Sequence, residues 1–356
     1  MGQMIKFEMG KIVRKRIVAI GILLILGLNL IVWVGWGTSA TTVWDENGRR
    51  LEGKEAIRFD QAIASEYEGQ LTDDLVKEIL GRFKHGEKVN WNSIYNSISI
   101  FFCDEEGNYN GDTVREVFPY YEEGPSLGYG YGWTRFINNM MLVMICLGCL
   151  VVVAVSPSFS DEYSRGMDAL ILTSRLGCTK CPRAKAIASM ILTTAASIVF
   201  SVMNLGAYLL VFGTDGWNAS AQLSYSGIFE DINFPVTYLQ VYILASVLWT
   251  VALLLLNGMV LLISSLCKTP FMALAVSLLF YLPPGFINGI DELWIQRVMG
   301  ILPARSMLIL DLIHGNKIHV FGMDMMFWWI YIGIAVVLTA AALWGSKRVF
   351  CRHQVV

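Results

Sequence analysis

The chain has 356 residues, of which 55% are hydrophobic and only 16% are charged, and its net charge is −2. Soluble domains carry about 25% charged residues, so this composition excludes an ordinary water-soluble protein and indicates a lipid environment. The total charge gives no reason to expect a nucleic-acid partner, because acidic and basic residues gather in different parts of the chain.

A short basic segment opens the chain. In residues 1–16, apolar side chains alternate with Lys6, Lys11, Arg14, Lys15 and Arg16. This pattern is typical of an amphipathic helix lying on a membrane surface. A solvated basic anchor is an equally good interpretation.

Six apolar stretches without internal charged residues follow the basic segment. A helix of about 20 residues, rising 1.5 Å per residue, crosses a hydrocarbon core of about 30 Å. We therefore expect membrane spans at 17–36, 136–156, 186–213, 236–266, 271–288 and 325–345. The fifth has the shortest apolar run, because Pro283 and Pro284 must break its helix near the far end.

The segments between these spans fall into two groups of opposite charge. Basic residues in short loops mark the cytoplasmic side of a membrane. The first group holds 14 lysines and arginines and four acidic residues, and comprises 1–16, 157–185, 267–270 and 346–356. The second group holds 13 basic and 25 acidic residues, and comprises 37–135, 214–235 and 289–324. We therefore place both termini in the cytoplasm and the second group outside.

Residues 37–135 are long enough to form a small α+β domain outside the membrane. Asn47-Gly48, between two short apolar stretches, predicts a hairpin. Thr72 is followed by two acidic residues, which is typical of a helix start. We expect helices at 56–68 and 72–83. The glycine-aromatic run 128–133, just before the second span, favours an aromatic belt at the outer membrane interface, with a ligand groove as the alternative.

No catalytic or nucleotide-binding arrangement stands out in the sequence. Residues 81–88 superficially resemble a phosphate-binding loop, but Glu87 stands where a lysine must follow the glycine. Cys178 and Cys181 have the spacing of half a zinc site, yet their loop offers no histidine. We therefore expect a chain that is not an enzyme and that itself holds neither a metal nor a cofactor.

A stripe of polar residues runs along the third expected span. Steps of three and four residues place all its members on one face of a helix. Close packing against another helix explains such small polar residues, and the alternative is a face that lines a substrate path or a subunit seam. The stripe consists of Ser189, Thr193, Ser197, Ser201, Asn204 and Tyr208.

The six expected spans contain no ionisable residue of the kind that proton-driven transporters place inside the membrane. If the chain moves a substrate uphill, the energy must therefore come from elsewhere. The loop between the second and third spans indicates a source, because it carries a spaced motif of an aromatic residue, an acid, a glycine, leucines and a downstream lysine. The motif positions are Phe159, Glu162, Gly166, Leu170, Leu172, Ser174 and Lys185.

This motif resembles the coupling segment of type-two ABC exporter permeases. Two positions depart from the pattern, since Met167 replaces the usual threonine and Arg175 stands where proline is common. The six-span plan, the basic N-terminus and the break after the fifth span are similar to the same family. The large first outer loop at 37–135 is similar to that of Gram-positive bacterial members.

The resemblance implies the permease subunit of an ATP-driven exporter in a bacterial plasma membrane. A separately encoded ABC ATPase, which binds ATP and Mg²⁺, would dock on residues 157–185, and a second permease copy or a related permease would complete the transporter. Glu162 and Arg165 would make polar contacts to the ATPase, Phe159 would make an apolar contact, and Gly166 would belong to the same coupling site. Alternatively, Glu162 and Arg165 merely solvate a loop. An alternative function is a non-transporting envelope sensor or mechanical transmitter coupled to an ATPase.

Overall fold

The computed structural model describes residues 1–45, 49–85, 88–89, 91–174, 176–287, 292–313, 317–320 and 323–352. These residues are mostly helical. Five helices are long and apolar enough to cross a membrane: Arg16–Ala40, Tyr131–Ser164, Gly177–Phe212, Tyr238–Leu266 and Phe327–Arg352. The fold is that expected of an α-helical membrane protein.

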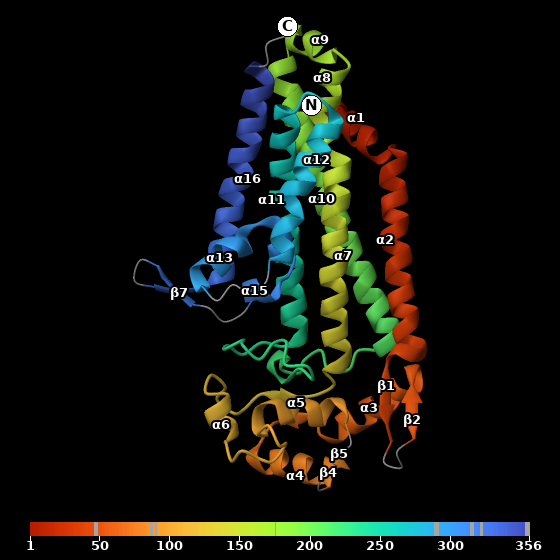
Figure 1. Cartoon of the computed structure of the whole chain (residues 1–356), viewed down its shortest axis with the longest axis vertical. Helices are drawn as coiled ribbons and strands as arrows, with labels where there is room; N and C mark the ends of the chain where they lie inside the picture. The colour runs from red at the N-terminus through yellow and green to blue at the C-terminus, as the bar shows by residue number, and fades with distance from the viewer. Residues whose placement is uncertain are drawn as a thin grey trace.

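Long helices form a bundle with a small domain at one end (Figure 1). The bundle helices are α2 (Arg16–Gly35, continued by the π-helical turn η1, Trp36–Ala40), α7 (Tyr131–Val155), α10 (Gly177–Phe212), α11 (Tyr238–Leu266) and α16 (Phe327–Arg352). Three short helices cover the end opposite the domain: α1 (Gly2–Val13), α8 (Pro157–Ser164) and α9 (Met167–Thr173). We call this the α8 end of the bundle and the other the domain end. The first and last helices of the chain both reach the α8 end.

The fifth expected span is a short helix, α12 (Pro270–Tyr281), followed by a 3₁₀ turn, η3 (Pro283–Phe286). Twelve residues of α-helix measure about 18 Å, less than the thickness of a hydrocarbon core. Tyr281 fixes α12 against α7, because its hydroxyl donates to the Ile145 carbonyl at 3.0 Å. An added Cβ at Gly148 would overlap the Tyr281 ring, so the two helices need glycine at this crossing.

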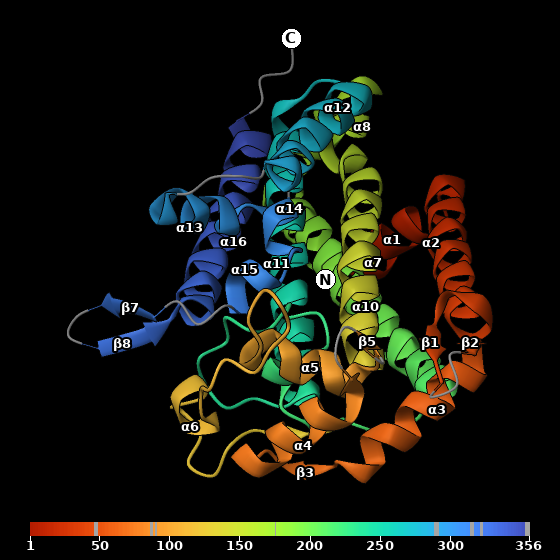
Figure 2. The same ribbon diagram turned by 60° about the horizontal axis from the view of Figure 1, so that its bottom comes forward.

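Part of the expected outer loop 289–324 folds back along the bundle instead of extending beyond it (Figures 1 and 2). It forms α13 (Leu293–Ile301), α14 (Pro303–Ser306), α15 (Leu310–Ile313) and the hairpin of β7 (Lys317–Val320) and β8 (Met323–Met326). The Trp249 indole on α11 donates to the Met307 carbonyl at 3.0 Å. The apolar residues of this segment explain the difference, since Met307, Ile309 and Leu312 are fully buried.

The domain between α2 and α7 consists of short helices and two-stranded sheets. The helices are α3 (Gly53–Glu66), α4 (Asp73–Phe83), α5 (Ser93–Phe102) and α6 (Val114–Val117). The paired strands are β1 (Thr42–Trp44) with β2 (Arg50–Glu52), β3 (Gly69–Gln70) with β6 (Ser126–Leu127), and β4 (Lys84–His85) with β5 (Lys88–Val89).

Two local predictions in this domain are confirmed. The β1–β2 pair is the expected hairpin, although its turn at Asn47-Gly48 lies outside the described residues. Thr72 caps α4, and its hydroxyl accepts a hydrogen bond from the Leu75 N–H at 3.3 Å. The expected aromatic belt was wrong for Trp133, which is 1% exposed. Its indole donates to the Asp215 carbonyl at 3.2 Å, so this aromatic residue joins α7 to the loop after α10.

Helix α10 begins nine residues earlier than the third expected span, at Gly177, and contains Pro182. Proline has no N–H, so it leaves the carbonyl of the residue four positions earlier without its helical partner. That residue is Cys178, and its carbonyl oxygen accepts a hydrogen bond from the Cys351 thiol of α16 at 3.1 Å. A side chain distant in sequence therefore allows the helix to continue through the proline.

Candidate functional site

The segment between α7 and α10 forms a sharp elbow made of α8 and α9. Gly166 lies between the two helices with φ of +64°, a left-handed conformation that favours glycine. We call residues 157–173 the elbow. It lies at the α8 end of the bundle, beside the first and last helices of the chain (Figure 1).

Helix α8 is fixed to the end of α11 through its own backbone. The first N–H groups of a helix have no partner within it. Here the Ser264 hydroxyl on α11 accepts from the N–H groups of Phe159 at 3.0 Å and Ser160 at 3.3 Å. In addition, the Tyr163 hydroxyl donates to the Ser265 carbonyl at 3.2 Å. These hydrogen bonds therefore fix α8 rigidly to the end of α11.

Four charged side chains bind the elbow to α1 and α10. Lys185 Nζ lies 2.7 Å from Glu162 Oε1 and 3.2 Å from Glu8 Oε2. Lys11 Nζ lies 2.8 Å from Glu8 Oε1 and 3.7 Å from Glu162 Oε1. The side chain of Lys185 is only 3% exposed, and a buried charge persists only when it is paired. We call these four residues the charge cluster; two lysines and two glutamates make it neutral.

Phe159 and Glu162 are both buried inside the chain, contrary to the expectation that they face an ATPase. The Phe159 ring packs 5.1 Å from the Phe350 ring of α16, and Lys185 Nζ lies 5.7 Å from its centroid. Glu162 points into the charge cluster. Both motif residues therefore hold the elbow in place, and Glu162 in addition lines a cavity between the elbow and α1.

The outer surface of the elbow is formed by other residues. Arg165 is exposed and pairs with Asp161 of the same helix at 3.0 Å. Met167 is 47% exposed and Leu170 is 68% exposed, so this surface carries apolar side chains beside charged ones. A cavity of about 460 Å³ lies between the elbow and α1, lined by both charged and apolar side chains, including those of Phe7, Arg165 and Met167. This surface can accept a partner with matching apolar and charged groups.

The polar stripe of α10 faces neighbouring helices, and all six of its residues are buried. Asn257 of α11 is central, because its amide accepts from the Ser189 hydroxyl at 3.0 Å and donates to the Thr193 hydroxyl at 2.6 Å. The hydroxyls of Ser197 and Thr250 lie 2.8 Å apart. These contacts make the stripe a hydrogen-bonded seam between α10 and α11, which is the packing interpretation.

Nearer the domain end, the stripe meets α2 and α7. The Asn139 amide donates to the Asn29 side-chain oxygen at 2.7 Å and to the Asn204 side-chain oxygen at 3.2 Å. The Trp33 indole donates to the same Asn204 oxygen at 3.2 Å. Tyr208 packs its ring 4.6 Å from Trp133. Sequence reasoning missed Asn29 and Asn139, although an asparagine inside an apolar run is itself a signal of a helix contact.

Within the described part of the chain, no three histidine, cysteine or acidic side chains gather as metal ligands. Sequence reasoning also missed Glu8 and assigned Lys11 only to the basic segment, although an acidic residue three positions before a lysine is the signal of an ion pair on a helix. Comparison of the chain with protein-family models and with curated proteins finds no match. The functional proposal therefore rests on the geometry of the elbow and on the motif within it.

Proposed function

We propose that this chain is the membrane-spanning permease subunit of an ATP-driven ABC exporter and that a separate ATPase docks on the elbow. The supporting observation is that a short, exposed elbow is fixed at once to α1, α10, α11 and α16. A push on such an element moves several bundle helices together. This is what a transporter needs when ATP is hydrolysed on another subunit.

In this proposal the elbow residues have two different tasks. Arg165, Gly166, Met167 and Leu170 meet the ATPase, because they are exposed at its tip. Glu162 and Phe159 lie behind the tip and carry its displacement into the charge cluster and α16. ATP and Mg²⁺ bind to the partner, and a second copy of this chain or a related permease completes the transporter.

The proposed topology has six spans in a bacterial plasma membrane. The fifth consists of α12 and η3, which together enter the bundle from the α8 end (Figure 2). The α8 end lies in the cytoplasm with both termini. The distribution of charge supports this, since the segments assigned to that side hold 14 basic and four acidic residues. The domain of α3 to α6 then lies outside the cell.

The decisive experiment is purification of the tagged full-length chain from native membranes, followed by an assay of MgATP hydrolysis. We expect an ATPase subunit to accompany the chain. Leu170→Asp should remove that ATPase, because it places a charge on the exposed apolar tip. Ile100→Asp is the matched control, since Ile100 is also an exposed apolar residue but lies on α5 of the domain.

Two outcomes oppose the proposal. Purified wild-type chain that hydrolyses no ATP and brings no ATPase with it would contradict a permease role. An ATPase that stays bound to Leu170→Asp as firmly as to Ile100→Asp would show that the elbow is not the docking surface. Transport itself is then measured in sealed vesicles that contain the chain and its ATPase.

A non-transporting sensor is the second candidate, and one observation favours it. A polar cavity of about 260 Å³ lies where the domain meets the loop after α10, and its lining includes Arg58, Gln61, Glu68 and Asp215. The Gln61 amide donates to the Phe212 carbonyl at the end of α10 at 2.5 Å. A ligand there could bias α10 directly. Ligand-dependent ATPase activity without movement of any compound across vesicles would favour the sensor.

A further inference from the structure

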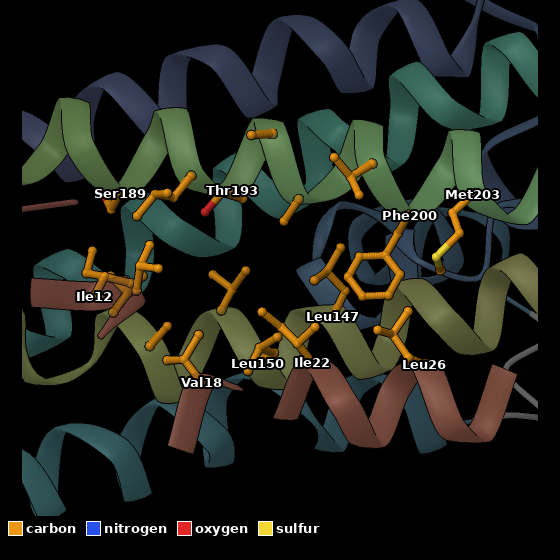
Figure 3. A pocket seen from close by; sticks show the side chains of 18 residues that line it. Ile12, Val18, Ile22, Leu26, Leu147, Leu150, Ser189, Thr193, Phe200 and Met203 are labelled. Atoms are coloured by element: carbon orange, nitrogen blue, oxygen red, sulfur yellow. The ribbon is translucent and has the colours of Figure 1, made fainter. Parts of the chain in front are cut away.

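An apolar cavity of about 350 Å³ lies between α2, α7 and α10 (Figure 3), and it shares no lining residue with the cavity between the elbow and α1. Its walls include Ile22 and Leu26 from α2, Leu150 from α7, and Ala196 and Met203 from α10. Among the described residues, Ser189 and Thr193 are the only polar ones in its lining, and both side chains are already hydrogen-bonded to Asn257. A polar ligand would therefore find no free partner in these walls.

The cavity is long and narrow. Its lining on α10 extends from Ser189 to Met203, about 21 Å along the helix axis at 1.5 Å per residue. This elongated apolar shape suits an extended hydrocarbon chain.

The cavity opens sideways between α2 and α10. These two helices converge at the domain end, where Trp33 bonds to Asn204 (Figure 1). Toward the α8 end they diverge, and Val199 in the cavity wall is 60% exposed. In a membrane this opening faces lipid, so hydrocarbon chains of the bilayer reach the cavity directly.

Basic residues stand where the cavity ends. Ile12 and Val13 of α1 close it at the α8 end, and Arg14, Lys15 and Arg16 follow at once. Lys15 Nζ donates to the carbonyl of Ala154, itself a lining residue, at 3.2 Å. In the described part of the chain these three basic residues form no ion pair.

The charge around Lys15 favours an added anion. Burial lowers the pKa of Lys15 below its usual value of 10.5. The carboxylates of Asp161 and Glu8 act in the opposite direction, while Lys185 and Lys11 add like charge. A phosphate beside Lys15 would supply the counter-charge that the protein leaves incomplete.

We propose that this cavity binds one acyl chain of an anionic phospholipid, with the phosphate held by Arg14, Lys15 and Arg16. Apolar burial retains the chain, and the basic triplet selects the head group, as juxtamembrane basic segments do at anionic membranes. The inference requires only that the bundle is embedded in a bilayer. Its failure would leave the permease proposal untouched, and the absence of an ATPase partner would leave this lipid site untouched.

The test uses the full-length chain in phosphatidylcholine vesicles that contain a small amount of one photoactivatable lipid. The lipid carries a diazirine at mid-chain and has either a phosphatidylglycerol or a phosphatidylcholine head group. After irradiation, crosslinked peptides are mapped. We expect crosslinks on the cavity walls of α7 and α10, with the phosphatidylglycerol probe favoured over phosphatidylcholine.

Two sets of variants separate the chain site from the head-group site. Ala196→Phe fills the cavity and should reduce the wall crosslinks several-fold, whereas Leu210→Phe, at a position 84% exposed on the same helix, should not. Arg14→Gln and Arg16→Gln should each reduce the preference for phosphatidylglycerol about fivefold at low salt. Equal crosslinking by both probes, unchanged by these variants, would show ordinary surrounding lipid and overturn the proposal. So would an absence of wall crosslinks.

Discussion

Lys185 makes two of the ion pairs in the charge cluster that binds the elbow to α1 and α10. It is buried between two carboxylates that come from α1 and α8. A pair of this kind adds little net stability compared with apolar packing, but removal of one partner leaves buried charge without compensation. The lysine therefore matters less for its own contribution than for the consequence of its loss.

We predict that Lys185→Met lowers the free energy of unfolding by about 3 kcal/mol. Removal of one partner of a buried ion pair usually costs about 3 to 5 kcal/mol, and we expect the lower value because Lys11 still faces both glutamates. The measurement is thermal unfolding of the purified full-length chain in detergent, which should show a lower Tm. Arg165→Gln is the control, because its exposed pair with Asp161 is worth less than about 1 kcal/mol.

A combined variant tests the reason for the loss. Lys185→Met together with Glu8→Gln and Glu162→Gln removes the charges that the single variant leaves buried. It should recover most of the lost stability. A triple variant as unstable as the single one would mean that Lys185 acts through packing, through its contact with the Phe159 ring for example.

Asp60 is a second buried charge, in the domain. Burial raises its pKa from 3.8 to about 6, although the Ser93 N–H that starts α5 donates to it at 2.9 Å and acts in the opposite direction. The folded state therefore holds a proton that the unfolded state has lost between these pH values. The contribution of Asp60 to stability is greatest below pH 4, falls as the pH rises to about 6, and is constant above that.

We predict a loss of about 3 kcal/mol in local stability across this pH range, because each pH unit between the unfolded and folded pKa values of Asp60 corresponds to about 1.36 kcal/mol. Hydrogen exchange of α5 amides, corrected for the intrinsic effect of pH, measures it. Asp60→Asn keeps the acceptor oxygen but cannot ionise, so its exchange should show no such step. A wild-type protein whose α5 protection rises between pH 4 and 6 would reverse the sign and refute this assignment.

At the scale of elements, helices with strong local signals were predictable and those fixed by distant contacts were not. Thr72 and its following acids mark the start of α4 in the sequence alone. The start of α10 at Gly177 was missed, because its continuation through Pro182 depends on Cys351 in a helix far along the chain. The elbow motif was visible, but the burial of Phe159 depends on Phe350 and could not be predicted.

The turn at Gly166 determines the angle between α8 and α9. Substitutions there should destabilise the elbow in the order of the backbone strain that each one causes. Nothing lies within 4 Å of a Cβ added at Gly166, so only its φ of +64° opposes a side chain. Asparagine adopts this conformation with little penalty, alanine at about 1 kcal/mol, and a β-branched residue at a higher cost. We predict that amide exchange in α9 accelerates in the order Gly166→Asn, Gly166→Ala, Gly166→Val.

Space around the residue provides the control for that series. Because the added side chain meets no neighbour, size alone should have no effect. Leucine and alanine should therefore behave alike, since neither is β-branched. If Gly166→Val exchanges as slowly as the wild-type chain, the elbow does not depend on this backbone conformation.

For the whole molecule, the domain and the bundle share one continuous apolar core. Gln61 of the domain bonds to the end of α10 across their junction, and the elbow is fixed at the opposite end of the bundle. Helix α10 extends from the charge cluster at Lys185 to the Gln61 contact at Phe212. A displacement at either end of the molecule is therefore transmitted along α10 to the other end. Both candidate functions require such transmission.

The orientation of the chain in the membrane decides which partners can reach the elbow. The basic loops predict that the elbow lies in the cytoplasm and the domain outside. Ser164 on α8 and Ser65 on α3 are both exposed serines at opposite ends of the molecule, so they suit a matched pair of probes. In a chain whose native cysteines are replaced by serine, so that Cys351→Ser keeps a donor for the carbonyl of residue 178, we predict that a membrane-impermeant maleimide added to intact cells labels Ser65→Cys and spares Ser164→Cys. Both should react once the membrane is opened, which shows that each thiol is accessible. Labelling of Ser164→Cys alone in intact cells would place the elbow where no ATP is available, and the permease proposal would fail with it.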